Sequence, residues 1–282
     1  MNKHTYSLAL PSLLLFISSY ATAQDLNEDL QRSVKRCNGD EIRKLLNKGA
    51  DPNIILDDEP PLMKCLSKEN IVIDLIAHGA DVNARGGEFK TPVVMQAARS
   101  TTTSIVRRLL AEGADANGAD KSNRTALFYL GEDPKGYSMM KLLLSHGADA
   151  NQTDTLQMTP LMMSARSGHV ANIQLLIEHG AILGVADKQG NLALGFAARN
   201  GHVAAVQILL KAGADIDAPD GYANKSALMI AVNSGHHNTV EELIRQGANV
   251  HMEDKTGETA LGIAEMGRKT RMIDILRKAG AR

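Results

Sequence analysis

The sequence predicts an all-α solenoid of about eight stacked helix–turn–helix units, and three observations carry this prediction. A Gly-Ala dipeptide returns at nearly constant steps of 30, 34, 34, 33, 33, 34 and 33 residues, and so regular a period is typical of repeat proteins. The apolar residues before each dipeptide follow the spacing of one helix face. Polar turn residues follow most of these dipeptides. The eight glycines are Gly49, Gly79, Gly113, Gly147, Gly180, Gly213, Gly247 and Gly280.

Residues 191–217 illustrate how one repeat is built. The first helix has alanines where a neighbouring helix must approach closely, and the second helix has one apolar face. Gly201 allows the tight turn between the helices, and Gly213 stands just past the second helix, where a left-handed residue closes it. Pro92 and Pro160 stand at the first turn of their helices, where a missing N–H does no harm. Because one repeat cannot bury its own apolar face, the repeats must stack on each other.

Several short motifs connect this period to a known family. They are Thr159-Pro160-Leu161, Gly168-His169, Gly201-His202, Gly235-His236 and the recurring Gly-Ala-Asp or Gly-Ala-Asn. In these motifs, over nearly all of residues 25–282, the chain resembles ankyrin-repeat proteins. The resemblance implies repeats with short β-turn or hairpin fingers. It also implies a concave face, built from the turn tips and the first helices, that binds another protein.

The predicted ankyrin-repeat domain covers residues 24–282. Its first repeat begins with polar residues and its last repeat carries several basic side chains, as the two ends of a stack require. Repeat 4 departs from the pattern at Asp133-Pro134-Lys135-Gly136, which predicts a looser or shifted turn. The departure indicates a kink, a feature that a partner reads, or simple sequence drift. Repeats 1 to 8 are expected at 25–53, 54–83, 84–117, 118–151, 152–184, 185–217, 218–251 and 252–282.

Residues 1–23 have the pattern of a cleavable secretory signal peptide. Lys3 and His4 precede a short apolar run, and small residues lead to Ala23, after which we expect cleavage. The run is too short to predict a bilayer span, and the alternative is a membrane anchor that stays attached. We therefore expect a periplasmic protein without stable membrane insertion, similar to exported bacterial ankyrin-repeat proteins.

The charge of the chain argues against a nucleic acid as partner. The sequence has 31 Lys and Arg residues against 32 Asp and Glu residues, with no long run of one sign. Nucleic-acid-binding domains need a concentrated basic surface. Aromatic residues make up only 3% of the chain and Trp is absent, so we expect a core of aliphatic side chains.

Cys37 and Cys65 are the only cysteines, and both are expected near the end of the first helix in their repeats. An oxidising compartment permits a disulfide between them, provided that their Cα atoms come within about 7 Å. Their positions within the repeat differ by two residues, so the sequence leaves open whether they form a disulfide or remain two buried thiols.

The sequence predicts no catalytic or metal-binding arrangement, and we expect no enzyme activity, no cofactor and no small-molecule substrate. His169, His202 and His236 recur at the Gly-His position, where the imidazole is expected to make a structural hydrogen bond. The sequence has neither a nucleophile elbow nor a phosphate-binding loop. The alternative is an enzyme with a hidden site in repeat 4 or in the degenerate first two repeats, for which loss of activity on mutating Asp133 or His146 would be the sign, but catalysis needs convergent titratable groups.

The turns differ between repeats while the frame around them stays constant, which is typical of a surface that carries binding specificity. Exposed aromatic and arginine side chains usually contribute most to interface energy. Phe128, Tyr129, Phe196, Met162 and Met163 follow the helical pattern and are predicted to be core or semi-buried residues. The predicted concave-face residues are Phe89, Arg99, Lys121, Arg124, Leu156, Met158, Arg166, Lys188, Arg199, Tyr222, Asn233 and Lys255.

These observations predict an exported, non-enzymatic, protein-binding module. The leading hypothesis is an immunity protein that binds a periplasmic toxin or effector protein and covers its active site with the concave face. The alternative is a periplasmic scaffold or stress-response protein that supports another enzyme, for example in antioxidant defence. Both hypotheses need the same fold and the same face, and both expect a toxin or an enzyme encoded nearby as the partner.

Overall fold

The structure is a computed structural model that describes residues 11–100 and 102–282, with side chains from residue 23 onward. The chain divides into two compact units, Met1–Asp115 and Ala116–Arg282, which we call the N-terminal unit and the C-terminal unit. Sixteen helices among the described residues form eight consecutive pairs. One pair falls within each predicted repeat range, except that α1 begins earlier, at Pro11. No helix in the described part of the chain has the length and apolar character to cross a bilayer.

The N-terminal unit contains three helix pairs and one short hairpin. First helices contact first helices (α1 with α3, α3 with α5), and α2 contacts α4. The hairpin is a finger in which β1 pairs antiparallel with β2. The elements are α1 (Pro11–Lys35), α2 (Gly39–Asn47), α3 (Pro61–Lys64), α4 (Glu69–Ala77), β1 (Arg85–Gly86), β2 (Thr91–Pro92), α5 (Val93–Ser100) and α6 (Thr103–Ala111).

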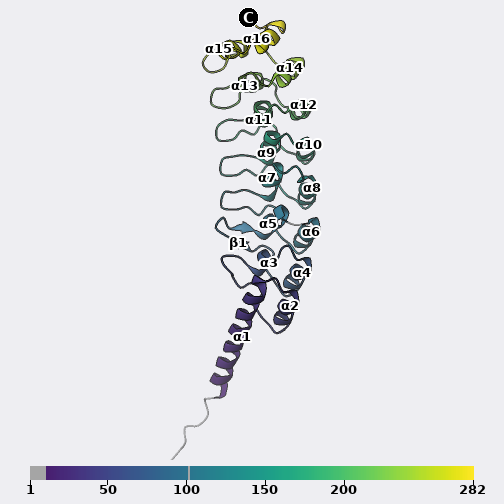
Figure 1. Ribbon diagram of the computed structural model, residues 1–282, viewed down its shortest axis with the longest axis vertical. Coiled ribbons are helices and arrows are strands. Elements are labelled where there is room, and N and C mark those ends of the chain that lie inside the picture. Colours follow the sequence, from purple (N-terminus) through teal and green to yellow (C-terminus); the bar gives the residue numbers. More distant parts are fainter. Residues whose placement is uncertain (1–10, 101) are drawn as a thin grey trace, which may run out of the picture. The chain divides into compact units, whose positions relative to one another are not determined.

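The C-terminal unit is a regular stack of five helix pairs. The first helices α7, α9, α11, α13 and α15 form one layer and the second helices α8, α10, α12, α14 and α16 form another (Figure 1). The all-α solenoid predicted from the sequence is confirmed. The elements are α7 (Ala126–Gly131), α8 (Tyr137–Ser145), α9 (Pro160–Ser167), α10 (Val170–Glu178), α11 (Ala193–Arg199), α12 (Val203–Lys211), α13 (Ala227–Ser234), α14 (His237–Arg245), α15 (Ala260–Met266) and α16 (Thr270–Lys278).

The core between the layers is aliphatic, as the composition predicts. In repeat 6, Ala197 and Ala198 of α11 and Val206 and Leu209 of α12 are completely buried. The small alanine side chains let α11 lie against both α9 and α13. Each helix pair therefore buries its apolar faces only because a neighbouring pair covers them.

The first helices begin at a hydroxyl residue in four of the five C-terminal repeats. The side-chain oxygens of Thr125, Thr159, Ser226 and Thr259 each accept a hydrogen bond from the backbone N–H three residues later, at 3.2–3.4 Å. Such a cap satisfies one of the N–H groups that a helix leaves free at its start. Repeat 6 is the exception because Leu192 stands at this position and offers no side-chain acceptor.

The Gly-His motif links each of repeats 5, 6 and 7 to the repeat before it. The Nε2 atom of His202 lies 3.0 Å from the carbonyl oxygen of Arg166, and that of His236 lies 2.9 Å from the carbonyl oxygen of Arg199. A Cβ atom on Gly168 would lie 2.6 Å from the imidazole of His202. The glycine thus makes room for the histidine of the next repeat. The predicted structural role of these histidines is confirmed.

The Gly-Ala-Asp-x-Asn ending provides a second link between repeats. The Asn117 amide donates to the carbonyl oxygen of Gly147 at 3.0 Å and accepts from the backbone N–H of Asp149 at 2.7 Å. Asn53 and Asn83 make the same pair of bonds inside the N-terminal unit. The motif therefore does more than end a helix, because its asparagine holds the corresponding motif of the next repeat.

This ladder is interrupted in repeat 5. Asn151 still bridges to Gly180 and Ile182, but Gly184 stands where the next asparagine would be. A Cβ atom on Gly184 would meet no atom within 4 Å, and its φ is not in the left-handed region. The position can therefore accept a side chain.

We expect Gly184→Asn to stabilise the C-terminal unit. The new amide can bridge to the carbonyl of Gly213 and the N–H of Asp215, and two partly exposed hydrogen bonds contribute about 0.5–2 kcal/mol together. Urea unfolding followed by circular dichroism measures the change. Gly184→Ala is the matched control because it adds the Cβ atom and reduces backbone freedom in the unfolded chain without the amide. Equal stability of the two variants would contradict the ladder interpretation.

The turn of repeat 4 is longer than its counterparts. Five residues, 132–136, connect α7 to α8, whereas two residues connect α9 to α10. The buried Asn172 donates to the carbonyl oxygens of Leu130 and Asp133, at 3.2 and 3.4 Å. The shifted turn predicted from the sequence is therefore present, and a side chain of repeat 5 holds it.

Cys37 and Cys65 form a disulfide in the N-terminal unit. Cys37 follows the end of α1 and Cys65 ends α3, with 5.7 Å between their Cα atoms. The bond closes a loop between positions 28 residues apart. It therefore ties the first two repeats together, which resolves the alternative that the sequence left open.

Removing the disulfide is expected to destabilise the first two repeats by roughly 2–4 kcal/mol, because the cross-link restricts the unfolded chain. Hydrogen exchange of the amides in α2, α3 and α4 should accelerate at least about tenfold in a Cys37→Ser, Cys65→Ser variant. Dithiothreitol should have the same effect on the parent protein and none on the variant. Unchanged exchange after reduction would contradict this role.

Of the predicted signal peptide, residues 1–10 lie outside those described, and the side chains of residues 11–22 are not described. Cleavage after Ala23 therefore stays a prediction.

Candidate functional site

Five fingers project from the layer of first helices in the C-terminal unit (Figure 1). Each finger closes where the N–H of an aspartate donates to a carbonyl four or five residues later, over 120–124, 154–158, 187–191, 220–225 and 254–258. Neighbouring fingers are joined by one backbone hydrogen bond of 2.9 Å. These bonds run from Thr155 to Ser122, from Lys188 to Leu156, from Gly221 to Gly190 and from Lys255 to Ala223.

In four of the five fingers, the side chain of the first residue, an aspartate, accepts hydrogen bonds from backbone N–H groups of the same finger. In Asp154, for example, Oδ1 accepts from the N–H groups of Leu156 and Met158 at 2.8 and 3.0 Å. Asp120, Asp187 and Asp254 make equivalent bonds to the second and fourth residues after them. These carboxylates are therefore structural acceptors, and their fingers present the remaining side chains in a fixed direction.

A cavity of about 500 Å³ lies between the fingers and the first helices of repeats 4 to 6, with Tyr222 of repeat 7 at its edge. Its lining combines guanidinium groups, aromatic rings and apolar side chains. Seven of the twelve residues predicted for the concave face line it. They are Arg124, Leu156, Met158, Arg166, Lys188, Arg199 and Tyr222.

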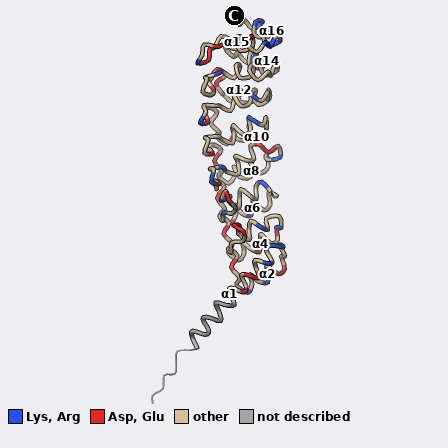
Figure 2. Tube along the Cα trace, turned by 60° about the vertical axis from the view of Figure 1, so that its left-hand side comes forward, with Lys and Arg blue, Asp and Glu red and all other residues tan. Residues whose placement is uncertain are grey.

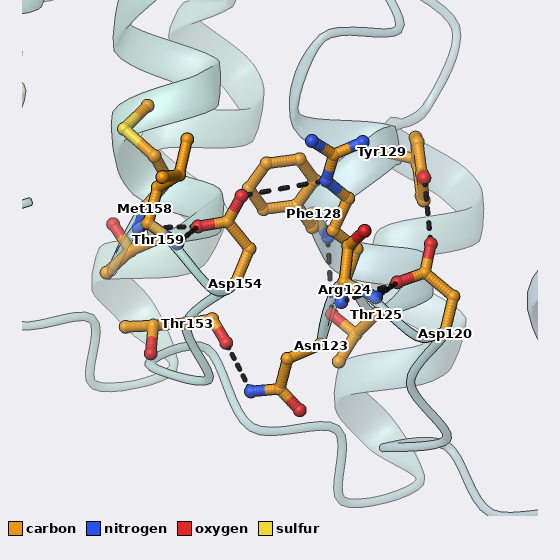
Figure 3. A network of polar contacts seen from close by, with 12 residues as sticks. Asp120, Asn123, Arg124, Thr125, Phe128, Tyr129, Thr153, Asp154, Met158 and Thr159 are labelled. Carbon is orange, nitrogen blue, oxygen red and sulfur yellow. Dashed lines mark hydrogen bonds and ion pairs between the residues drawn. The ribbon is translucent and has the colours of Figure 1, made fainter. Parts of the chain in front are cut away.

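Arg124 lies at one end of the cavity, over two aromatic rings (Figure 3). Its guanidinium carbon is 5.4 Å from the ring centre of Phe128 and 5.9 Å from that of Tyr129. Its Nε atom is 3.6 Å from Oδ2 of Asp154, and the Tyr129 hydroxyl donates to Asp120 at 3.0 Å. The pKa of Arg124 is raised above its ordinary value, mainly by Tyr129 and to a smaller extent by the nearby carboxylates. The guanidinium is thus a positive charge that lies beside two aromatic rings and one carboxylate.

Arg166 and Arg199 continue the row along α9 and α11. Arg166 forms an exposed ion pair with Glu132. Arg199 donates to the side-chain oxygen of Asn191 at 3.2 Å and lies 5.8 Å from the ring centre of Phe196. The backbone carbonyls of both arginines are the acceptors of the Gly-His links, so the stack itself determines where the row lies.

Aromatic side chains are concentrated at this cavity. Outside residues 1–23 the chain has six aromatic residues, and four of them, Phe128, Tyr129, Phe196 and Tyr222, line the cavity. The predicted packing of Phe128, Phe196 and Met163 is correct in that all three are buried. The same side chains nevertheless form part of the cavity wall, which their helical spacing did not reveal.

Met158 and the five predicted residues that do not line this cavity are placed as follows. Met158 lines the cavity but is buried, so it is not an exposed anchor at a finger tip. Lys121 and Lys255 are exposed on fingers outside the cavity lining, and Phe89 and Arg99 are exposed in the N-terminal unit. Asn233 lines a second cavity of about 430 Å³, which shares Arg199 and Tyr222 with the first.

Asp220 in the second cavity departs from the other finger aspartates. Its finger is one residue longer, and Oδ2 accepts from the backbone N–H of Leu192 in the preceding repeat at 2.7 Å. It thus supplies an acceptor at the start of α11, where Leu192 provides none. A Cβ atom on Gly195 would lie 2.0 Å from this carboxylate, so only glycine leaves room for it. The other oxygen, Oδ1, is buried without a hydrogen-bond partner.

Burial raises the pKa of Asp220 from 3.8 to about 6. The bond from Leu192 and the charge of Arg199 lower this pKa, and the charge of Asp187 raises it, but burial is the largest effect. Because the folded state favours the protonated form of Asp220, this group contributes fully to the stability of the folded state below the pKa that it has in the unfolded chain. That contribution is lost as the pH rises through about 6.

Asp220→Asn should therefore stabilise the protein above pH 7, by about 1–3 kcal/mol. The amide keeps an acceptor for Leu192 but cannot ionise, so the gain over the parent should shrink steadily between pH 7.5 and pH 4.5. Thermal unfolding across this range measures the difference. Asp274→Asn, at an exposed position on α16, is the charge-matched control. A difference between Asp220→Asn and the parent that does not change with pH would contradict the assignment.

No group of three or more His, Cys, Asp and Glu side chains in the part of the chain that is described is arranged to hold a metal ion. Basic and acidic residues are interspersed along the C-terminal unit instead of being gathered by sign (Figure 2). The charges that line the cavity therefore interact mainly with nearby partners and do not form one large patch of a single sign.

The stacked helix pairs, the fingers and the lined cavity together define a repeat solenoid with a binding face. A family model of ankyrin repeats, in three copies, matches residues 62–154, 132–220 and 221–282. These ranges cover more than half of the chain, which belongs to the ankyrin-repeat family. Ankyrin repeats generally mediate protein–protein interaction, and the family is typically a non-enzymatic module. A search of curated proteins finds no match to the chain.

Proposed function

We propose that this protein is an exported, non-enzymatic module that binds another protein through the cavity of its C-terminal unit. The observation that carries the proposal is the concentration of aromatic and arginine side chains on the fingers and first helices of three successive repeats. Tyr and Arg are enriched among the residues that dominate binding energy at interfaces. Their surroundings hold these side chains in place, which reduces the entropy lost on binding.

The exposed rim of the cavity supports a protein partner. Leu156 and Tyr222 expose 55% and 70% of their surface, on the two fingers that flank the finger of Lys188. Apolar side chains this exposed, beside a cavity with polar groups, are typical of a surface that a partner covers. The cavity is wide enough to receive side chains from such a partner.

Two observations support export to an oxidising compartment. The first is the leader pattern of residues 1–23. The second is the Cys37–Cys65 disulfide, because such bonds persist mainly outside the reducing cytosol. Together they favour the periplasm, where the partner would be a toxin or effector protein that this module neutralises by covering its active site.

Affinity capture from periplasmic extract tests this function. The parent protein should retain one specific partner in a stoichiometric complex, and Leu156→Ala with Tyr222→Ala should weaken it at least about tenfold. Ile182→Ala with Met266→Ala is the control, because both side chains are exposed and apolar but lie outside the cavity lining. Titration calorimetry measures both affinities, and the activity of the captured partner is assayed with and without the module. Equal losses in the two variants, or no specific partner, would refute the proposal.

The proposed export is tested by a separate measurement. The chain should be recovered from the periplasm with Gln24 as its first residue, and Cys37 and Cys65 should resist alkylation until a reductant is added. Recovery of the unprocessed chain from the cytoplasm with free thiols would refute the proposed location.

A further inference from the structure

The carboxylates of the cavity wall are already engaged by the protein itself. Asp154 and Asp187 accept backbone hydrogen bonds from their own fingers. Asp187 also accepts from the Asn191 amide at 2.9 Å. Glu132 is paired with Arg166. The negative groups of the wall are therefore turned toward the protein and not toward a ligand.

Two cations of the same wall are not paired in this way. Among the described residues, neither Lys188 nor Arg199 forms an ion pair with a carboxylate within 4 Å, although both line the cavity and the charge of Arg199 acts on Asp220. Both belong to repeat 6: Lys188 is on its finger and Arg199 is at the end of α11. The Arg166–Glu132 pair beside them is exposed, and such pairs are weak enough to be exchanged for another partner.

Apolar side chains lie on either side of Lys188. Its backbone N–H donates to the carbonyl oxygen of Leu156 at 2.9 Å. Its carbonyl oxygen accepts from the Tyr222 hydroxyl at 3.0 Å. The fingers thus present an exposed aliphatic side chain, a cation and an exposed aromatic ring in that order. Behind this rim, Arg199 lies over the ring of Phe196.

We infer that the cavity recognises an acidic segment of the partner protein, which carries at least two carboxylates and an apolar side chain. One carboxylate pairs with Arg199 and another pairs with Lys188, while the apolar side chain packs against Leu156 and Tyr222. This inference rests on the proposed function and adds the chemistry of the segment that is bound. Guanidinium groups suit carboxylates because their N–H groups match the two oxygens.

A nucleic acid is the competing anionic ligand, since cations and aromatic rings also bind single strands. The interspersed charges of the C-terminal unit (Figure 2) do not provide the continuous basic groove that such binding needs. The observations therefore favour an acidic polypeptide, and an oligonucleotide becomes one arm of the test.

Selection from a random heptapeptide library displayed on phage, with the immobilised full chain as bait, tests the inference. The selected peptides should be enriched in Asp and Glu together with one apolar residue. A fluorescein-labelled synthetic copy of a selected peptide gives the affinity by fluorescence anisotropy, and the affinity should fall as NaCl increases.

Charge reversal then locates the peptide. The double variant Lys188→Glu, Arg199→Glu should bind the acidic peptide at least about tenfold more weakly than the parent does. Lys211→Glu with Lys278→Glu makes the same change in charge on α12 and α16, outside the cavity, and should leave the affinity within about twofold. A peptide with Lys in place of its acidic residues should bind the cavity variant better than it binds the parent, which a merely misfolded variant would not do.

Enrichment of basic or uncharged peptides, no enrichment, or preferential binding of a fluorescein-labelled single-stranded oligonucleotide would overturn the inference. Equal sensitivity of the acidic peptide to the two charge-reversal variants would overturn it as well. The proposed function fails separately: it is refuted when the captured periplasmic partner is insensitive to Leu156→Ala with Tyr222→Ala. A partner that needs those two residues but not Lys188 and Arg199 would refute the acidic segment and leave the protein-binding function in place.

Discussion

The structure depends on the coupling between neighbouring repeats, because no helix pair can bury its apolar faces alone. Burial supplies the driving force, but it does not fix the register of one pair on the next. Polar links do that. Asn117 holds both the carbonyl of Gly147 and the N–H of Asp149, and His202 holds the carbonyl of Arg166. These bonds are directional, so each repeat can dock in only one position.

The same links build the candidate site. The carbonyls that the Gly-His motif holds belong to Arg166 and Arg199, whose side chains line the cavity. The bonds between fingers place Leu156, Lys188 and Tyr222 along one rim. Each of these links joins only adjacent repeats, yet together they hold in place a surface that spans several repeats. Its specificity can vary through finger side chains, since the bonds that hold the fingers use the backbone and the leading aspartates.

Asp220 shows that the stack of repeats can accommodate a helix start without a hydroxyl cap. Leu192 deprives α11 of the hydroxyl cap found in neighbouring repeats, and Asp220 reaches back from the next repeat to supply an acceptor. The carboxylate is buried and keeps one oxygen without a partner, which raises its pKa to about 6. The carboxylate accepts from the N–H of Leu192 itself and not from the N–H that a hydroxyl cap would satisfy, and its contribution to stability depends on pH.

The sequence by itself determined the class of fold, the number of repeats and the structural role of the Gly-His histidines, because a strict period leaves few ways to bury an apolar face. It also indicated seven of the sixteen residues that line the cavity, mainly because finger positions vary against a constant frame. It did not reveal that Phe128 and Phe196 are both packed and part of that wall, that Asp220 serves the preceding repeat, or that Cys37 and Cys65 are bonded. Those features depend on which atoms of adjacent repeats face each other. Sequence spacing defines the repeat, but only the stacking of one repeat on the next brings those atoms together.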